Sequence, residues 1–413
     1  MTEWIGAAEA AQRLGIKPAS LYAYVSRGVL SRRREADGRV SLFDADEVDE
    51  LARKGRPRRA AGGMAELVIE SALTEITSTT QRYRGYDATD LALRCRFEDV
   101  AMLLWTGSLP AGRAAASGGD WQATAQALAA GRAAQAALPP GTLPLERLQV
   151  IVPALAATDQ FRLHLDVPAV VQAGKALVAG LVDALPEPAV ADRPASAYPA
   201  DPGVAGRLAP KLCAGPVPAG LVRVLNAALV LVADHELAAS TLAARVAASM
   251  RADPYAVVAT GLGAMGGALH GGAALGAELM LGSARSPADA PRVVGDLLRR
   301  GEKLPGFGHF VYKTGDPRAN LLLRLIAEFA PEAPQLAIAS AVTDEASRRA
   351  LPEPNIEFAL AVLAGAGGMI RGAGEAIFAT GRTAGWLAHA LEEYERNIPI
   401  RPRSVYTGPA AMS

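Results

Sequence analysis

From about residue 64 to the C-terminus, the sequence consists largely of alanine and leucine runs interrupted by glycine and proline. The stretch GLVRVLNAALVLVADHELAASTLAARVAASM (220–250) is typical, and RTAGWLAHALEEYERN (382–397) follows the same pattern. Alanine and leucine are strong helix formers, and few alternating β-branched residues compete with them. This feature predicts a mainly helical protein. A chain of 413 residues is long enough for two or three domains with a large core.

The composition argues against several classes of protein. The formal net charge is zero, which gives no whole-chain signal for nucleic acid or membrane binding. Cys95 and Cys213 are too few for a disulfide scaffold or a cysteine-ligated metal site. The N-terminus lacks the order of a signal peptide, and no uncharged apolar run is long enough to span a bilayer. We therefore expect a cytoplasmic protein that does not associate with membranes.

The first sixty residues predict a separate unit. GAAEAAQRLG (6–15) has helical spacing, a second helix starts near Pro18, and two short strands flank Asp37-Gly38 before a helix capped by Asp44. This order resembles the small winged helix-turn-helix domain of the MerR and excisionase type. The resemblance implies possible DNA binding through Arg27, Arg32, Arg33, Arg34 and Arg39. A protein-interaction module is the alternative, and the basic segment 53–63 predicts a flexible linker.

Three of the five histidines stand in polar or glycine-rich contexts: His235 in DHELAAST, His270 in LHGGA and His309 in GFGH. Glycine lets the backbone approach a ligand closely. The other two, His164 and His389, have ordinary surroundings and are expected to be structural. No histidine pair has the i, i+4 spacing of metal ligands, so we expect no metal site.

Arginines recur in the same part of the chain, in the motifs GDPRAN, TGRTAGW and IRPRSVYTG. Their planar guanidinium groups match carboxylates with two parallel hydrogen bonds. Several arginines converging with neutral histidines would suit a small dicarboxylate.

These segments, with YRGY and NIEF, resemble motifs of the citrate synthase family and follow in the family's order, from about residue 65 to the C-terminus. The resemblance implies a two-domain, all-helical fold preceded by the winged helix-turn-helix domain. The expected boundaries are 1–53 for the winged domain, 54–64 for the linker and 65–413 for the enzyme. Within the enzyme, 65–271 and 376–413 would form the large domain and 272–375 a lid.

The resemblance also implies residue roles in condensing acetyl-CoA with oxaloacetate, with no cofactor. His270 would donate to the enolate oxygen, His309 would polarise the ketone, and Glu357 would be the general base. The carboxylates of oxaloacetate would be held by His235, Arg318, Arg382 and Arg401. In the family the last arginine comes from the partner subunit, which implies a homodimer. CoA would contact Gly306, Phe307, Gly308 and Lys313.

The sequence departs from the family pattern next to the main ligands. Glu357 replaces the family's aspartate, which adds a methylene to the base. Phe310 replaces a frequent arginine, and Ala238, Ala274 and Leu275 replace common polar residues. Two alternatives therefore stay open. One is 2-methylcitrate synthesis from propionyl-CoA, and the other is a DNA-binding regulator whose enzyme domain senses acyl-CoA or oxaloacetate.

Overall fold

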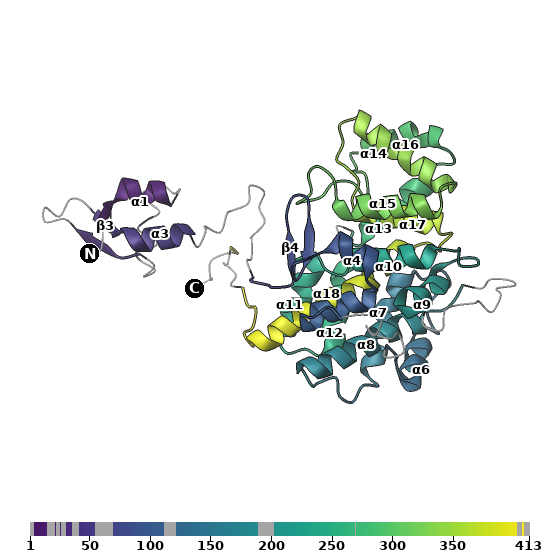
Figure 1. The fold of residues 1–413 in the computed structure, drawn as a ribbon, viewed down its shortest axis with the longest axis horizontal. Coiled ribbons are helices and arrows are strands. Elements are labelled where there is room, and N and C mark those ends of the chain that lie inside the picture. Colours follow the sequence, from purple (N-terminus) through teal and green to yellow (C-terminus); the bar gives the residue numbers. More distant parts are fainter. Residues whose placement is uncertain are drawn as a thin grey trace. The chain divides into compact units, whose positions relative to one another are not determined.

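The chain forms two compact units, Met1–Glu70 and Ser71–Ser413, in the computed structural model (Figure 1). The structure describes residues 4–14, 21, 25, 30–34, 41–53, 69–110, 121–188, 202–268, 270–402 and 407–408.

The first unit is a three-stranded antiparallel sheet with helices. Its elements are β1 (Trp4–Gly6), α1 (Ala7–Arg13), β2 (Arg32–Arg34), β3 (Ser41–Asp44) and α3 (Ala45–Arg53), and the strand order is β1-β3-β2. Asp44 caps α3 as predicted, because its Oδ1 accepts hydrogen bonds from the backbone N–H groups of Asp46 and Glu47 at 3.0 and 3.3 Å. The strand β1 was not predicted from the sequence, since three residues are too few to show a period.

The predicted second helix of this unit lies mostly outside the described residues. Leu21 and Val25 are helical, and Leu21 is fully buried in a core that also contains Phe43 and Val48. The unit therefore has its own hydrophobic centre, separate from that of the second unit.

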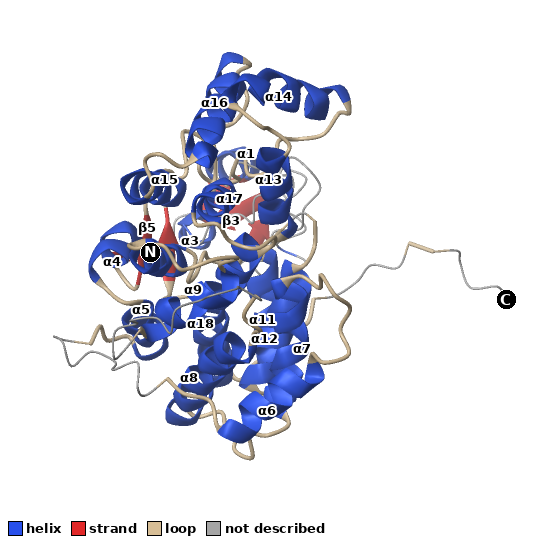
Figure 2. Ribbon diagram, turned by 90° about the vertical axis from the view of Figure 1, so that its right-hand side faces the viewer, coloured by secondary structure: helices blue, strands red, loops and turns tan. Residues whose placement is uncertain are grey.

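The second unit is almost entirely helical (Figure 2), which confirms the predicted fold class. Its strands are β4 (Thr74–Ile76), β5 (Gln81–Tyr83) and β6 (Tyr86–Asp87). Its first helices in chain order are α4 (Ala88–Arg94), α5 (Phe97–Thr106), α6 (Ala125–Ala134), α7 (Pro144–Ala156), α8 (Val167–Ala184), α9 (Gly203–Leu212), α10 (Leu221–Leu231), α11 (Ala239–Ser249) and α12 (Pro254–Met265). They are followed by α13 (Gly272–Gly282), the 3-10 turn η2 (Pro287–Asp289), α14 (Ala290–Arg299), α15 (Pro317–Phe329), α16 (Pro334–Arg348), α17 (Ile356–Ala366) and α18 (Ala373–Arg396).

Helix α18 is the centre of the second unit. It packs against α11, α10, α12, α5, α8 and α7 on several sides and also contacts α17 and α13, and nearly all of its residues from Ala373 to Leu391 are buried. In Figure 1 the helices α13–α17 form one group at the upper end of this unit. A helix buried all round brings its polar side chains into the core, where each needs a partner or a ligand. Those side chains are Glu375, Arg382 and His389 among others.

One described helix, α8, is long and apolar enough to cross a membrane by length and composition. Most of it is buried in the unit, where it packs against α5, α6, α7, α9 and α18. Its apolar character is therefore that of a core helix.

The small sheet β4-β5-β6 begins the second unit. Its strands pair antiparallel, with Thr74 opposite Tyr83 and Ile76 opposite Gln81. Arg84 and Gly85, between β5 and β6, both have positive φ angles of 47° and 88°, as a tight hairpin turn requires. The Arg84 side chain is fixed by two hydrogen bonds to the carbonyl of Leu104, at 3.1 and 2.9 Å. The hairpin thereby holds Gln81 and Tyr83 in buried positions.

Candidate active site

The loop that carries His309 is fixed against the start of α17. The backbone N–H of Asn355 donates to the carbonyl of Gly306 (2.8 Å), and its side-chain amide donates to the carbonyl of Gly308 (2.9 Å). Gly306 has a φ of +78°, and a Cβ there would lie 2.8 Å from the Cβ of Phe358. The glycine is thus required by packing between two segments of the protein. The predicted contacts of Gly306, Phe307 and Gly308 with CoA stay predictions.

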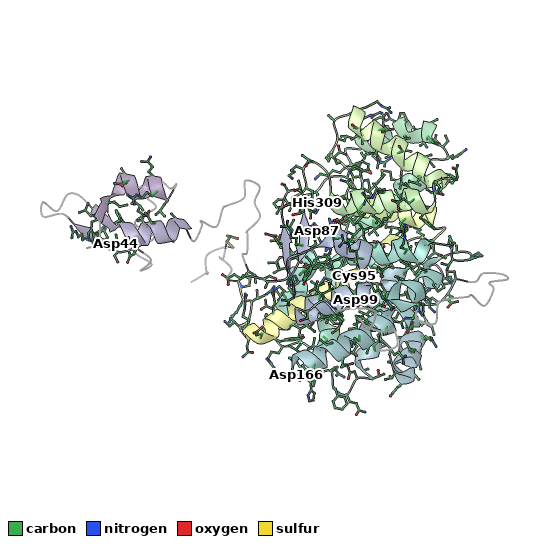
Figure 3. All side chains as sticks on the ribbon, in the orientation of Figure 1. Asp44, Asp87, Cys95, Asp99, Asp166 and His309 are labelled. Atoms are coloured by element: carbon green, nitrogen blue, oxygen red, sulfur yellow. The ribbon has the colours of Figure 1, made fainter. Side chains whose placement is uncertain are left out.

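His309 is held as one neutral tautomer. Its Nδ1 accepts hydrogen bonds from the backbone N–H groups of Val311 (3.0 Å) and Tyr312 (3.2 Å), so the ring proton is on Nε2. The imidazole stacks on the Tyr312 ring, with centroids 4.6 Å apart. Burial, with help from the nearby Arg318 charge, lowers the pKa of His309 to about 4. At neutral pH its Nε2–H is therefore a hydrogen-bond donor without a net charge. Figure 3 labels His309 at the edge of the α13–α17 group, above Asp87.

His235 lies beside this ring pair. Its ring is edge-on to His309 at 5.0 Å and to Tyr312 at 5.7 Å between centroids. Burial first, and then the positive charges of Arg318 and Arg382, hold the pKa of His235 well below its ordinary value. Among the residues that the structure describes, its buried Nε2 has no hydrogen-bond partner. This atom is therefore available to a ligand.

Arg382 presents a similar unpartnered group. It lies in α18 with 1% of its surface exposed. Its Nε donates to the carbonyl of Val232 at 2.7 Å, and its buried Nη1 has no partner within the described part of the chain. Burial lowers the pKa of Arg382 to about 10, against the opposing charge of Asp234, so the side chain remains a cation at neutral pH. A buried cation of this kind is suited to an anionic ligand.

Arg318 is already paired within the protein. Its Nε and Nη2 donate to the two oxygens of Asp316 at 2.9 and 2.7 Å, and both side chains are buried. Asp316 also accepts from the backbone N–H of Ile356 at 3.2 Å, which links the loop to α17 again. Nη1 of Arg318 makes no hydrogen bond to the other described residues and can bind a ligand. Asp316 is therefore a positioning residue that the sequence reasoning missed, although it stands in the quoted GDPRAN motif.

His270 lies just before α13 and is oriented by Ser240 and Trp386. Trp386 Nε1–H donates to Ser240 Oγ at 3.3 Å, and Ser240 Oγ lies 2.7 Å from His270 Nε2. Because Ser240 is fully buried, its hydroxyl proton is satisfied by donation to Nε2, which puts the imidazole proton on Nδ1. Burial lowers the pKa of His270 to about 4, with a smaller effect of Arg382. Ser240 was also missed, although it lies within DHELAAST.

One aromatic ring brings His270 and Arg382 into the same site. The Phe378 ring lies 5.9 Å edge-on from the His270 ring and 4.6 Å from the guanidinium carbon of Arg382. The Tyr312 ring similarly joins His309 to Arg318. It stacks on the His309 ring, and the guanidinium carbon of Arg318 lies 5.5 Å from its centroid.

Glu357 lies in the first turn of α17. The side chain of Asn355 caps this helix by accepting from the backbone N–H groups of Glu357 (3.0 Å) and Phe358 (3.4 Å). Burial raises the pKa of Glu357 above its ordinary value, while the charges of Arg318 and Arg382 act in the opposite direction. The carboxylate therefore shares the field of both arginines, and its raised pKa suits a proton acceptor.

A groove of about 510 Å³ opens next to His309. Its walls are Leu298, Glu302, Lys303, Leu304, Phe307, Gly308, His309, Phe310, Leu351 and Pro352. Phe310 is 80% exposed, and the exposed Lys313 places its Nζ 3.1 Å from the carbonyl of His309. Lys303 is a second cation at this groove that the sequence reasoning missed.

Two further sets of predicted residues belong to other parts of the chain. Arg401 is exposed in the segment after α18. In the first unit, Arg32 to Arg34 form β2, and the guanidinium of Arg33 lies 4.8 Å from the centre of the Trp4 ring. Arg27 and Arg39 lie outside the described residues.

Comparisons with known proteins agree on one family. The family model "Citrate synthase, C-terminal domain" matches residues 63–403. "Citrate synthase 2" of Bacillus subtilis is 32% identical over 370 residues, covering 82% of this chain and 93% of that protein. "2-methylcitrate synthase" of Mycobacterium tuberculosis is 30% identical over 360 residues, covering 84% and 90%. The solved ternary complex of citrate synthase from Thermoplasma acidophilum with carboxymethyl coenzyme A and oxaloacetate has a TM-score of 0.71 at 25% identity, covering 87% of this chain and 98% of that one.

Proposed function

The chain belongs to the citrate synthase family, and we propose that it condenses acetyl-CoA with oxaloacetate to give citrate and CoA. The observation that carries the proposal is a pair of buried side-chain nitrogens that have no hydrogen-bond partner among the described residues. These are Nε2 of His235 and Nη1 of Arg382. Together with Nη1 of Arg318, they would bind the two carboxylates of a small 2-oxo acid.

In the proposed reaction, Glu357 removes a proton from the methyl group of the thioester. The thioester oxygen becomes negative and accepts a hydrogen bond from Nδ1–H of His270. The low pKa of His270 keeps this imidazole neutral. The enolate carbon attacks the ketone carbon of oxaloacetate, and the ketone oxygen takes a proton from Nε2 of His309. Hydrolysis of the new thioester then releases citrate and CoA.

We assign the groove beside His309 to CoA. Phe307 and Phe310 offer aromatic surface there, and Lys303 offers positive charge for phosphates. Lys313 adds a second positive charge next to the groove, since its Nζ lies 5.6 Å from the centre of the Phe310 ring. Helices α13–α17 form a group of their own, which supports residues 272–375 as the lid and 65–271 with 376–413 as the large domain. Closure of such a lid would exclude water while the enolate exists.

The first test is release of free CoA thiol from acetyl-CoA, which we expect only when oxaloacetate is present. The relative named 2-methylcitrate synthase favours propionyl-CoA as a second acyl donor, so both thioesters are assayed with a series of 2-oxo acids. Silence with both thioesters would refute the enzyme assignment. Oxaloacetate binding without turnover would instead favour a sensor.

We also propose a homodimer in which Arg401 reaches the partner's site. The segment that carries Arg401 leaves the end of α18 beside the end of α11, where Ile400 N–H donates to Ser249 Oγ at 3.0 Å. Met250 and Ile398, which are 66% and 63% exposed, provide apolar surface at this place for a second copy. Analytical ultracentrifugation tests the dimer, and Arg401→Ala should then raise the KM for oxaloacetate without changing the sedimentation coefficient.

For the first unit we propose a winged helix-turn-helix fold with DNA as its partner. Helix α1, the helical residues Leu21 and Val25, the antiparallel strand pair β2–β3 and helix α3 follow one another, and Arg32 and Arg33 are exposed on β2. Filter binding of the full chain to random duplex DNA should weaken as salt rises and weaken further in Arg33→Ala. Binding that is absent at low salt would favour a protein-interaction role.

A further inference from the structure

A chain of buried charged groups lies behind His235, and the proposed mechanism does not use it. The side chains of Asp234, Arg245 and His389 are fully buried, and Glu393 is 1% exposed. Buried charges are costly unless they are paired and hydrogen-bonded, so the pairing shows how each group is held.

The hydrogen bonds define where the protons lie. Nη1 of Arg245 is 2.7 Å from Nδ1 of His389, and because a guanidinium can only donate, Nδ1 accepts. The imidazole proton is therefore on Nε2, which faces the carboxylate of Asp234 at 3.2 and 3.3 Å. At the other end, Nε of Arg245 donates to Glu393 at 2.6 Å.

Asp234 is held from a second side by the β4–β5 hairpin. The hydroxyl of Thr74 donates to Oδ2 of Asp234 at 2.5 Å. Burial alone would raise the pKa of Asp234, but His389, Arg382 and Thr74 together hold it below the ordinary value. Asp234 is therefore an ionised carboxylate inside the protein.

Residues 232–235, which include Asp234, include one proposed substrate ligand and contact the other. His235 follows Asp234 directly, and Nε of Arg382 donates to the carbonyl of Val232 at 2.7 Å. The backbone of Asp234 is fixed as well, since Nε2 of Gln81 donates to its carbonyl at 2.8 Å. The charge of Asp234 also offsets that of Arg382, whose guanidinium has an unpartnered Nη1 among the described residues.

We propose that Asp234, His389 and Arg245 are positioning residues of the 2-oxo acid site, which hold His235 and Arg382 in place and so set the affinity for oxaloacetate. None of the three is proposed to contact the substrate. The inference rests on the assignment of His235 and Arg382 as oxaloacetate ligands in the proposed function.

The test uses substitutions at one end and in the middle of the network, in the full chain. Thr74→Val removes one hydrogen bond to Asp234 and keeps the shape of the side chain. His389→Leu removes both hydrogen bonds of the imidazole, and His389→Gln keeps a donor and an acceptor at about the same separation. Thr77→Val is the matched control, because Thr77 follows β4 directly. Among the described residues its hydroxyl bonds only within the turn, to Thr80 Oγ1 at 2.8 Å and to the backbone N–H groups of Thr79 and Thr80.

We expect Thr74→Val to raise the KM for oxaloacetate by about tenfold, the effect of one lost hydrogen bond to a charged group, and His389→Leu, which loses two, by at least about tenfold. The KM for acetyl-CoA should change by less than about twofold, since CoA is assigned to a separate groove. His389→Gln should recover most of the oxaloacetate affinity, and Thr77→Val should match the wild type.

Three outcomes would overturn the inference. The first is a folded Thr74→Val protein with unchanged oxaloacetate KM, and the second is an equal rise of both KM values. Thr74→Val decides the matter if His389→Leu does not fold, because Thr74 lies at the edge of the core. The third is a wild type that does not bind oxaloacetate in calorimetry, which would also remove the proposed function. The first two outcomes leave the proposed function intact.

Discussion

Glu375 provides a prediction whose size follows from the structure. It lies in the first turn of α18, it is 4% exposed, and among the described residues no hydrogen bond reaches its carboxylate. Burial raises its pKa from 4.5 to about 7, and the nearby carboxylates of Glu278 and Glu146 add to the effect. Glu278 itself accepts hydrogen bonds from the backbone N–H groups of Gly372 and Gly374, at 2.7 and 2.9 Å.

The perturbation is Glu375→Gln, which removes the charge and keeps the shape. A rise from 4.5 to about 7 is a shift of about 2.5, which corresponds to about 3 kcal/mol. Because the pKa of Glu375 is raised in the folded state, protonation of Glu375 stabilises the folded wild type by this amount. The stabilisation is complete below pH 4.5 and is lost as the pH rises through 7. The variant should therefore exceed the wild type in the free energy of unfolding by about 3 kcal/mol above pH 8, and the gain should be about 2 kcal/mol smaller at pH 5.

The measurement is urea unfolding at pH 5 and pH 8.5, at one protein concentration, followed by tryptophan fluorescence. Trp105, Trp121 and Trp386 are all buried in the second unit and report its unfolding. Glu332→Gln, which changes an exposed carboxylate, is the control for the loss of one charge. A difference between Glu375→Gln and wild type that is the same at both pH values would refute the reasoning.

Further predictions concern Glu357, the proposed base, and Arg382, whose Nη1 has no hydrogen-bond partner among the described residues. Glu357→Gln should lower kcat by at least about 100-fold while calorimetry shows oxaloacetate binding unchanged, and full activity would show that Glu357 is not the base. Because burial raises the pKa of Glu357 above 4.5, kcat should fall with acid through a pKa above that value, and a limb at or below 4.5 would contradict the assignment. Arg382→Leu should raise the KM for oxaloacetate by at least about 30-fold, as loss of a buried charge partner does, and a KM within threefold of the wild type would exclude Arg382 as a ligand.

The helical class of the second unit could be predicted because alanine and leucine act locally, whatever surrounds them. The histidine and arginine motifs also pointed to residues that the fold brings together, such as His235 beside His309. The partners of these residues could not be predicted in the same way. His389 stands among alanines and leucines in the sequence, and its role depends on Arg245, 144 positions away, and Asp234, 155 positions away. Gly306 is required by Phe358, a contact that only the folded chain creates.

The joining of the His309 loop to α17 has a kinetic consequence. The Asn355 amide donates to the carbonyl of Gly308, and Asp316 accepts from the backbone N–H of Ile356. With the close contact of Gly306 to Phe358, these bonds join the loop and the start of α17 into one rigid part. His309 and Glu357, the proposed ketone activator and base, therefore belong to one rigid part. Oxaloacetate would contact this part and the neighbouring His235 together, and its binding would fix the position of the base. Acetyl-CoA would then bind to a site in which the base is already in position. The two substrates should therefore bind in a compulsory order, with the 2-oxo acid first.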